Sequence, residues 1–388
     1  MKHQHHHHHY HKRIAVFWTL IDGNLPYYFD LTLATLLNAG ADNIDIHVIV
    51  PLIPIEYCNM NGNNNNEYGN YMNILHQQDS TSSSSSSSSI CNIIYSNPIN
   101  QVYFHSVTPN EWLKRINEKL NITLPYDIKK SMKKIADMKP MLGYLFQDFI
   151  PYNMYSYWIY GDYDGFFGSY NNMIDYNILY EYDVISGISY ADDNITVFAG
   201  TTIRCTGAWT MWRNNYFINT LFMRSINWIK MLQDGKEIYA FDEQTRPRYS
   251  GEESMNMVLE LSHDVRQCCL NNRIPSVKKR NGSVIIAEMV RRFVESPGGI
   301  LTFKWERNKG ITVIADGPFG FGEVYKKEVL NDVLFFHFLD WKYCCSNEME
   351  AGIKGLMKTV NDKQMTVFDI NCFTFIGTNF HNLTFSLC

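Results

Sequence analysis

The sequence predicts an α/β protein, because short strands of β-branched and aromatic residues alternate with helical segments. Residues 14–18 (Ile-Ala-Val-Phe-Trp) have the composition of a buried strand. Apolar side chains recur at helical spacing over residues 26–38, and Gly40 follows where a helix would end. Residues 44–50 are the next predicted strand. These segments predict a β-α-β unit, which is typical of a sheet with parallel strands.

Two further strands and a helix continue the alternation. Residues 90–95 and 102–104 are predicted strands. The next helix is expected to begin after Thr108, because Thr108 can cap its N-terminus and Pro109 suits the first helical position. Glu111 lies where a capping box needs an acidic side chain. The start of this helix is therefore specified by three neighbouring residues.

A helical segment and a strand lead to the junction on which the functional argument depends. Residues 129–149 are expected to be mostly helical despite Pro140. Residues 157–160 (Tyr-Trp-Ile-Tyr) are a predicted buried strand. Residues 161–165 (Gly-Asp-Tyr-Asp-Gly) follow directly, so two carboxylates lie just past the end of a strand.

Length and composition exclude several classes of protein. The chain has 388 residues, of which 45% are hydrophobic, so it can bury a sizeable core. Its formal net charge of −5 argues against a surface built to bind nucleic acid. The apolar runs fall short of the roughly 20 residues that a membrane helix needs. Residues 1–13 lack the apolar segment of a secretory signal, so the sequence predicts a cytoplasmic protein.

The nine cysteines include no C-x-x-C pair. Their spacing therefore suggests neither a zinc site nor a complete disulfide framework. An odd number of cysteines in a chain without a signal sequence is typical of reduced thiols. Reduced cysteines are the expectation.

Two segments of biased composition are set apart from the fold. Residues 1–11 are expected to be a disordered histidine-rich tail, although a histidine run can bind a metal. Residues 59–89 are rich in asparagine and serine, and eight serines follow one another over residues 82–89. Such a segment buries too little apolar surface to offset the entropy of ordering it. It is predicted to be a flexible surface insertion within one domain.

The two carboxylates after the strand at 157–160 form a candidate cation site. Ligands of open α/β sheets bind beyond the carboxyl ends of the strands. In extended backbone, Asp162 and Asp164 point to the same side, and two like charges there need a cation. Carboxylate oxygens suit Mg²⁺ or Mn²⁺, which commonly complete their coordination with substrate phosphates. The alternative is that both aspartates only form a turn.

The residues around these aspartates resemble a known family. Residues 136–146 are similar to the pattern D-x-K-P-x-x-G-x-x-F, carried by Asp137, Lys139 and Pro140, and residues 157–168 to W-G-x-x-D-x-D-x-x-x-G. This pattern belongs to polysaccharide-biosynthesis-type glycosyltransferases of the GT-A fold, a family often catalogued as a domain of unknown function. The chain departs from it over residues 158–161, where Trp-Ile-Tyr-Gly replaces the usual Trp-Gly.

Three later segments are similar to further pieces of the family pattern and occur in its order. They are residues 206–214, which end in Arg-Asn, residues 241–243 (Phe-Asp-Glu) and residues 335–342, which contain His337. The resemblance implies a GT-A-like catalytic domain over residues 12–345, with a single mostly parallel central sheet flanked by helices. Residues 346–388 would be a C-terminal extension packed on that domain.

The resemblance also implies an activity, namely the metal-dependent transfer of a sugar from a nucleotide-sugar donor to the hydroxyl of a glycan or polysaccharide. The implied cofactor is Mn²⁺ or Mg²⁺, held by Asp162, Asp164 and His337. A general base must deprotonate the acceptor in an inverting reaction. Asp242 and Glu243 are the implied candidates, with Glu252 and Glu253 as a nearby alternative pair.

The implied donor-binding residues have separate tasks. Trp18 and Thr19 would contact the base, and Asp137 a sugar or ribose hydroxyl. Lys139 or Lys342 would face the phosphates. Arg213 and Asn214 would contact the acceptor or the donor sugar. The implied donor site is therefore Trp18, Thr19, Asp137, Lys139, Asp162, Arg213, Asn214 and Lys342. Each of these residues also has an ordinary structural alternative: core packing, capping, a salt bridge or a solvated surface.

Two other functions compete with glycosyl transfer. One is a catalytically silent relative that binds glycans through its aromatic residues, which make up 14% of the chain. The other is a nucleotidyl- or phosphotransferase that uses the same pair of carboxylates on phosphate. No membrane span and no nucleic-acid partner are expected for any of the three.

Overall fold

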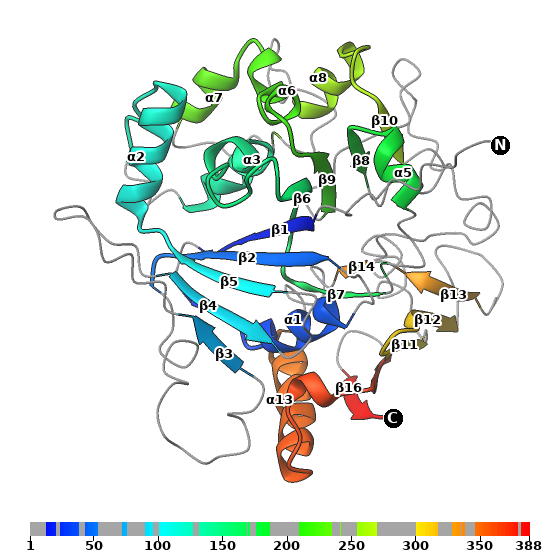
Figure 1. Cartoon of the computed structure of the whole chain (residues 1–388). Coiled ribbons are helices and arrows are strands. Elements are labelled where there is room, and N and C mark those ends of the chain that lie inside the picture. Colours follow the sequence, from blue (N-terminus) through cyan, green and yellow to red (C-terminus); the bar gives the residue numbers. More distant parts are fainter. Residues whose placement is uncertain are drawn as a thin grey trace, which may run out of the picture.

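The computed structural model contains a large sheet with helices on both faces and a second, smaller sheet (Figure 1). The α/β class predicted from the sequence is therefore confirmed. The structure describes residues 13–20, 24–38, 43–52, 72–75, 90–95, 101–126, 132–168, 170, 176–186, 209–234, 241, 254–269, 300–316, 328–333, 335–337, 346–378 and 382–388.

The large sheet has nine strands in the order β10-β8-β9-β6-β1-β2-β5-β4-β3. Their bounds are β1 Arg13–Thr19, β2 Ile44–Val50, β3 Met72–Leu75, β4 Ile90–Tyr95, β5 Gln101–Ser106, β6 Tyr155–Gly161, β8 Val184–Ser186, β9 Trp209–Arg213 and β10 Gln267–Cys269. The four central strands β6, β1, β2 and β5 are parallel, as is the pair β8 and β10. β9 runs antiparallel to β6 and β8, and β4 runs antiparallel to β5 and β3.

This sheet is mixed, so the expected mostly parallel sheet describes only its centre. Each strand predicted in the first half of the chain is present, but strand direction depends on the connections. Residues 96–100 alone separate β4 from β5. A parallel crossover needs a dozen or more residues, so a link this short makes the two strands antiparallel. Residues 72–75 of the predicted flexible insertion form the edge strand β3, and the rest of that insertion lies outside the described residues.

The alternating side chains of β1 explain why helices cover both faces of the sheet. Ile14, Val16 and Trp18 pack toward α1 (Phe29–Leu37), which covers one face. Ala15 and Phe17 pack into the core on the other face. The described helices there are α2 Pro109–Leu120, η3 Met132–Met141, α3 Leu142–Leu145, α6 Tyr216–Asn219, η4 Leu221–Arg224, α7 Trp228–Gln233 and α8 Met255–Leu261. A further helix, α5, spans Tyr176–Glu181.

The predicted start of α2 is confirmed in detail. The Thr108 hydroxyl accepts the backbone N–H of Glu111, and the Glu111 carboxylate accepts the backbone N–H of Thr108 at 2.7 Å. The helical prediction over 129–149 is only partly met, because residues 132–141 form a 3₁₀ helix and the α-helical part is limited to α3.

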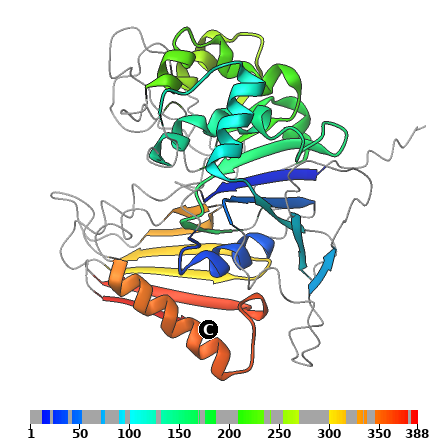
Figure 2. The same cartoon turned by 90° about the vertical axis from the view of Figure 1, so that its left-hand side faces the viewer.

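The second sheet is formed near the C-terminus and is antiparallel throughout, in the order β13-β12-β11-β15-β16. Its strands are β11 Ile300–Glu306, β12 Gly310–Asp316, β13 Glu328–Val333, β15 Cys372–Thr378 and β16 Asn382–Leu387. Helix α13 (Ser346–Asp362) lies along this sheet (Figure 2), with Gly352 against the ring of Phe385. The short helix η5 (Val367–Asp369) leads from α13 to β15. Residues 346–388 thus supply two of the five strands.

A shared core joins the two sheets. Tyr28, Leu31 and Ala34 at α1 belong to the same buried cluster as Phe303 and Trp305 of β11 and the inward face of α13. A two-stranded ribbon, β7 (Gly165–Phe167) with β14 (Phe335–His337), lies between them. The C-terminal region is therefore packed directly against the segment that follows Asp164.

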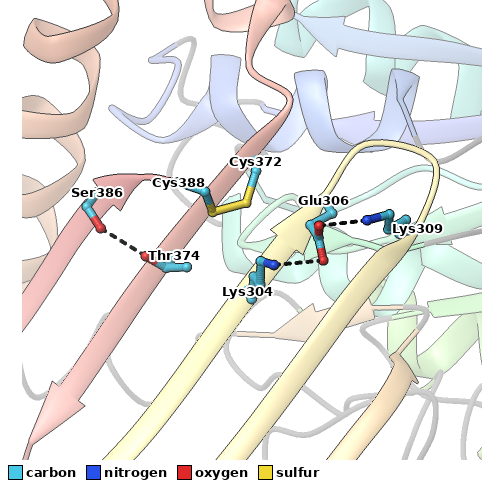
Figure 3. Close-up of a disulfide and its surroundings, with 7 residues drawn as sticks. All are labelled: Lys304, Glu306, Lys309, Cys372, Thr374, Ser386 and Cys388. Carbon is cyan, nitrogen blue, oxygen red and sulfur yellow. Dashed lines mark hydrogen bonds and ion pairs between the residues drawn. A yellow bond between two sulfur atoms is a disulfide. The ribbon is translucent and has the colours of Figure 1, made fainter.

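A disulfide between Cys372 and Cys388 links the start of β15 to the residue after β16 (Figure 3). The Cα atoms are 5.4 Å apart, and the hydroxyl pair Thr374–Ser386 continues the cross-strand contacts at 2.9 Å. For this pair the expectation of reduced cysteines is corrected. The spacing of the cysteines did not predict this disulfide, because the two residues form no C-x-x-C motif. The hairpin of β15 and β16 brings them opposite each other.

Within the described residues, no helix combines the length and the apolar character needed to span a bilayer.

Replacing Gly143 with alanine is expected to destabilise the protein by about 1–3 kcal/mol, because a Cβ atom there overpacks the core. That atom would lie 2.3 Å from Cε2 and Nε1 of the buried Trp158 ring. Gly355→Ala in α13 is the matched control, since a Cβ atom there has no neighbour within 4 Å. Urea denaturation should show a loss for Gly143→Ala and a small gain for Gly355→Ala. Equal stability of the two variants would contradict the close packing of Gly143 on Trp158.

Candidate functional site

The candidate site lies where β6 ends, at the carboxyl ends of the parallel strands in the centre of the sheet. Residues 162–164 connect β6 to β7, and β7 is held on two sides. The backbone N–H of Phe167 donates to Thr35 Oγ1 at 3.0 Å, and Trp305 Nε1 donates to the Phe167 carbonyl at 2.9 Å. Both aspartates are therefore carried by a segment that α1 and the second sheet fix in place.

Lys139 reaches this segment from η3. Its Nζ lies 2.8 Å from Oδ1 of Asp162, and the two side chains are 17% and 30% exposed. The pair joins the Asp-x-Lys-Pro segment to the Asp-x-Asp segment, which the sequence suggested separately. Asp162 thus already attracts one cation, and it keeps access to solvent.

Asp164 is nearly buried, at 5% exposure, beside the start of α1. The Tyr28 ring stacks on Tyr163 with centroids 6.5 Å apart. Burial raises the pKa of Tyr28, and the negative charges of Asp164 and Asp162 raise it further. Both carboxylates are therefore within electrostatic reach of one buried phenol, which stays neutral.

The pairing of β14 with β7 places the backbone of His337, the third predicted metal ligand, opposite the segment that follows Asp164. His337 is paired with Gly165, the residue that follows Asp164. Lys342 lies outside the described residues. In the part of the chain that the structure describes, no three His, Cys, Asp or Glu side chains form a ready metal-binding group. Two carboxylates still suit a hard divalent cation that takes its other ligands from phosphates and water.

Asp137 is buried and faces other protein groups. It pairs with the buried Lys134, whose Nζ is 2.8 Å away, and its Oδ1 accepts the backbone N–H of Phe241 at 3.1 Å. These contacts account for the side chain without a sugar or ribose. Asp137 instead anchors the residue that directly precedes Asp242 and Glu243, and these two candidates lie outside the described residues, as does the alternative pair 252–253.

Arg213 and Asn214 lie at the opposite end of β6, because β9 runs antiparallel to it and Arg213 is paired with Tyr157. Arg213 makes an ion pair of 2.7 Å with Asp183 and donates to three carbonyl oxygens. The buried Asn214 amide donates to the Ile150 carbonyl at 2.8 Å. The structure does not bring these two residues to the aspartates.

Trp18 and Thr19 are in the last two positions of β1. Trp18 is completely buried and packs edge-to-face on Phe29, with ring centroids 5.6 Å apart. Its ring is a core contact between β1 and α1 and offers no face to a nucleotide base in this conformation. Thr19 is partly buried at the carboxyl end of the strand, on the side of the sheet edge where the aspartates lie.

Sequence reasoning missed Asn219, which connects three of the segments that carry the family resemblance. Its Oδ1 accepts Trp158 Nε1–H at 2.8 Å, and its Nδ2 donates to the Gly143 carbonyl at 3.1 Å. Asn214 Oδ1 lies 3.0 Å from the same Nδ2. No local pattern marks Asn219, because its partners come from residues 5 to 76 positions away. Gly143, Trp158 and Asn214 thus have a shared structural role.

The comparisons identify one family. Residues 92–361 match a family of unknown function (DUF6625). No curated protein matches the chain. The matched range contains Lys139, both aspartates and His337, whereas Thr19 and Tyr28 lie before it.

Proposed function

We propose, from the premise that this chain belongs to the DUF6625 family of unknown function, that it is a metal-dependent glycosyltransferase. It would move a sugar from a nucleotide-sugar donor to a hydroxyl group of a glycan or polysaccharide. The proposal includes a GT-A-like arrangement, supported by the parallel strands β6, β1, β2 and β5 and by the aspartates at their carboxyl ends.

The single observation that carries the proposal is that separate motif segments meet around the Asp-x-Asp turn. Lys139 is ion-paired with Asp162, and His337 is paired in register with Gly165. Asp137, two residues before Lys139, holds the backbone of Phe241. A site for a charged ligand would use a cationic side chain and a further ligand beside the two carboxylates.

The chemistry of this neighbourhood suits a nucleoside diphosphate as the leaving group. A divalent ion, Mn²⁺ or Mg²⁺, would stabilise the negative charge that develops on the diphosphate. Asp162 and Asp164 would hold that ion, with His337 as a further ligand, and Lys139 would neutralise a phosphate oxygen. Asp242 or Glu243, which follow Phe241 in the sequence, would take the proton from the acceptor hydroxyl.

A panel of nucleotide sugars tests this function. The purified protein is incubated with each donor, with Mn²⁺ or with a chelator, and the nucleotide products are separated by chromatography. Release of a nucleoside diphosphate that depends on the metal is the expected result. Release of pyrophosphate would indicate nucleotidyl transfer, and binding of glycans without turnover of any donor would indicate a silent relative; either result would contradict the proposal.

A further inference from the structure

We propose that Lys139 is a built-in counter-ion that makes the divalent metal and the nucleoside diphosphate bind together, each weakly without the other. This inference rests on the proposed function and adds that the binding of each ligand depends on the other. Lys139 holds Asp162 in the ligand-free protein, and it is released only when a phosphate group arrives to replace that carboxylate.

The geometry shows that Lys139 is presented to Asp162 by a fixed backbone. Its neighbours Met138 and Pro140 are buried, and the Lys134–Asp137 ion pair of 2.8 Å anchors the same turn. The charged end of Lys139 therefore moves by rotation of its own side chain and not by movement of η3. Because the lysine is 17% exposed, its ammonium has room to exchange one oxygen partner for another.

Electrostatics makes either ligand alone unfavourable. A divalent ion that arrives first meets an ammonium 2.8 Å from the oxygen that it needs. It must displace Lys139, which then loses its carboxylate partner, or bind beside a like charge. A diphosphate that arrives first meets two carboxylates and a lysine that is already engaged.

When both ligands arrive, every charge finds an opposite partner. Asp162 would then hold the metal, and Lys139 would pair with a phosphate oxygen. Each ligand then relieves the electrostatic repulsion that the other meets when it binds alone, so binding is cooperative. Such coupling is reciprocal: if the diphosphate raises the affinity for the metal, the metal raises the affinity for the diphosphate by the same factor.

If the Lys139–Asp162 ion pair has only a structural role, the effect of Lys139→Met on metal affinity has the opposite sign. If Lys139 only braces the turn, Lys139→Met loosens the aspartates and metal binding weakens. If Lys139 is the counter-ion, Lys139→Met removes a cation that competes for the Asp162 carboxylate, and binding of the metal alone becomes tighter. Lys139→Arg keeps the charge and should keep the coupling.

Calorimetry separates these cases. Mn²⁺ alone, UDP or GDP alone, and each nucleotide with Mn²⁺ are titrated into the wild type, Lys139→Met and Lys139→Arg. Lys119→Met is the matched control, because Lys119 also lies in an ion pair, with Asp148 at 3.0 Å, and not with Asp162 or Asp164. In the wild type and in this control, the nucleotide should raise Mn²⁺ affinity by roughly 10- to 100-fold.

In Lys139→Met, Mn²⁺ alone is expected to bind about 10-fold more tightly than in the wild type, and the further gain from the nucleotide should be smaller than in the wild type. Unchanged or weaker binding of Mn²⁺ alone by Lys139→Met, with an unchanged melting temperature, would overturn the counter-ion role and leave the proposed function intact. If the wild type binds neither nucleotide in an Mn²⁺-dependent way, the proposed function itself fails.

Discussion

Asp164→Asn is expected to remove most of the metal-dependent binding of a nucleoside diphosphate. Asparagine keeps the size and the hydrogen-bonding capacity of the side chain but removes the negative charge. Asp164 is 5% exposed, so water cannot readily take over the lost position. Changes to residues that only support a metal ligand cost about 10- to 100-fold in affinity, so loss of one of two carboxylate ligands should cost at least about 100-fold.

Stability is expected to hold or rise in the same variant. Without the metal, Asp162 and Asp164 are two neighbouring negative charges, and Lys139 is ion-paired with Asp162. Removing the charge at 164 relieves the repulsion between them. A loss of binding together with an unchanged or higher melting temperature therefore distinguishes a ligand from a residue that only forms the turn.

The measurement is calorimetry of UDP and GDP with and without Mn²⁺, beside thermal melts. Asp264→Asn is the matched control, since Asp264 is an exposed carboxylate ion-paired with Arg224 in another part of the molecule. His337→Ala should lose less than Asp164→Asn, because two carboxylates, phosphate oxygens and water can still complete six ligands. Full metal-dependent binding in Asp164→Asn would refute the assignment of the site.

The positions of the strands along the first half of the chain could be predicted, because strand formation is largely local. The runs at 14–18, 44–50 and 157–160 are mostly apolar, short and bounded by breaks, and each is a strand of the large sheet. Which strands become neighbours and in what direction is not local. The antiparallel places of β4 and β9 depend on chain connections and on the sheet as a whole.

The second sheet was missed although its strands carry a readable signal. β11 alternates inward Phe303 and Trp305 with Lys304 and Glu306, which form an ion pair of 3.0 Å on the other face. This period of two predicts a half-buried strand. The partner strand β15 follows only after α13, so no local pattern joins it to β11.

Whether the role of a site residue could be predicted depends on the groups that surround it in the fold. The turn at Asp162 and Asp164 was predictable, because its position after a strand implies the edge where ligands bind. Asp137 and Arg213 were expected to bind the donor, yet each has buried or fixed protein partners. Residue type alone does not reveal whether a charge is already satisfied. Tyr28 was missed because it lies far in sequence from the aspartates beside which it packs.

A buried chain of polar groups that begins at the other end of the central strands gives the protein a second measurable property. Asp45 pairs with Arg13 and accepts the Tyr155 hydroxyl at 2.8 Å. Because that proton is donated to Asp45, the Tyr155 oxygen accepts from His47 Nε2 at 3.3 Å. His47 Nδ1 then accepts from His105 Nε2 at 2.9 Å. Both imidazoles are neutral in this arrangement.

Protonation of these rings is disfavoured in the folded state. Burial lowers the pKa of His105 to about 3; the charge of Asp148 opposes this shift, and that of Arg115 adds to it. Burial also lowers the pKa of His47 well below its usual value, with further lowering by His105 and Arg13. His105 stacks on Phe149 with centroids 3.8 Å apart, and within the described residues its Nδ1 has no hydrogen-bond partner.

Stability should therefore fall as the pH drops from about 6.5, where an unfolded histidine takes up its proton. The folded protein does not bind that proton until the pH nears the lowered value, so the unfolded state binds more protons in between. For His105 alone, the free energy of unfolding should fall by roughly 3 kcal/mol by pH 4.5, at about 1.36 kcal/mol for each pH unit. Above pH 7 this contribution should be constant.

His105→Phe tests the origin of this acid sensitivity. Phenylalanine keeps a ring against Phe149 but binds no proton, so the slope of unfolding free energy against pH between 6 and 4.5 should drop by about 1.4 kcal/mol per pH unit. At pH 7.5 the variant should be about 1 kcal/mol less stable, because His47 loses its hydrogen-bond donor. His263→Gln, at an exposed histidine, should leave the slope unchanged. Urea denaturation at four pH values measures all three proteins, and equal slopes for the wild type and His105→Phe would show that the acid sensitivity arises elsewhere.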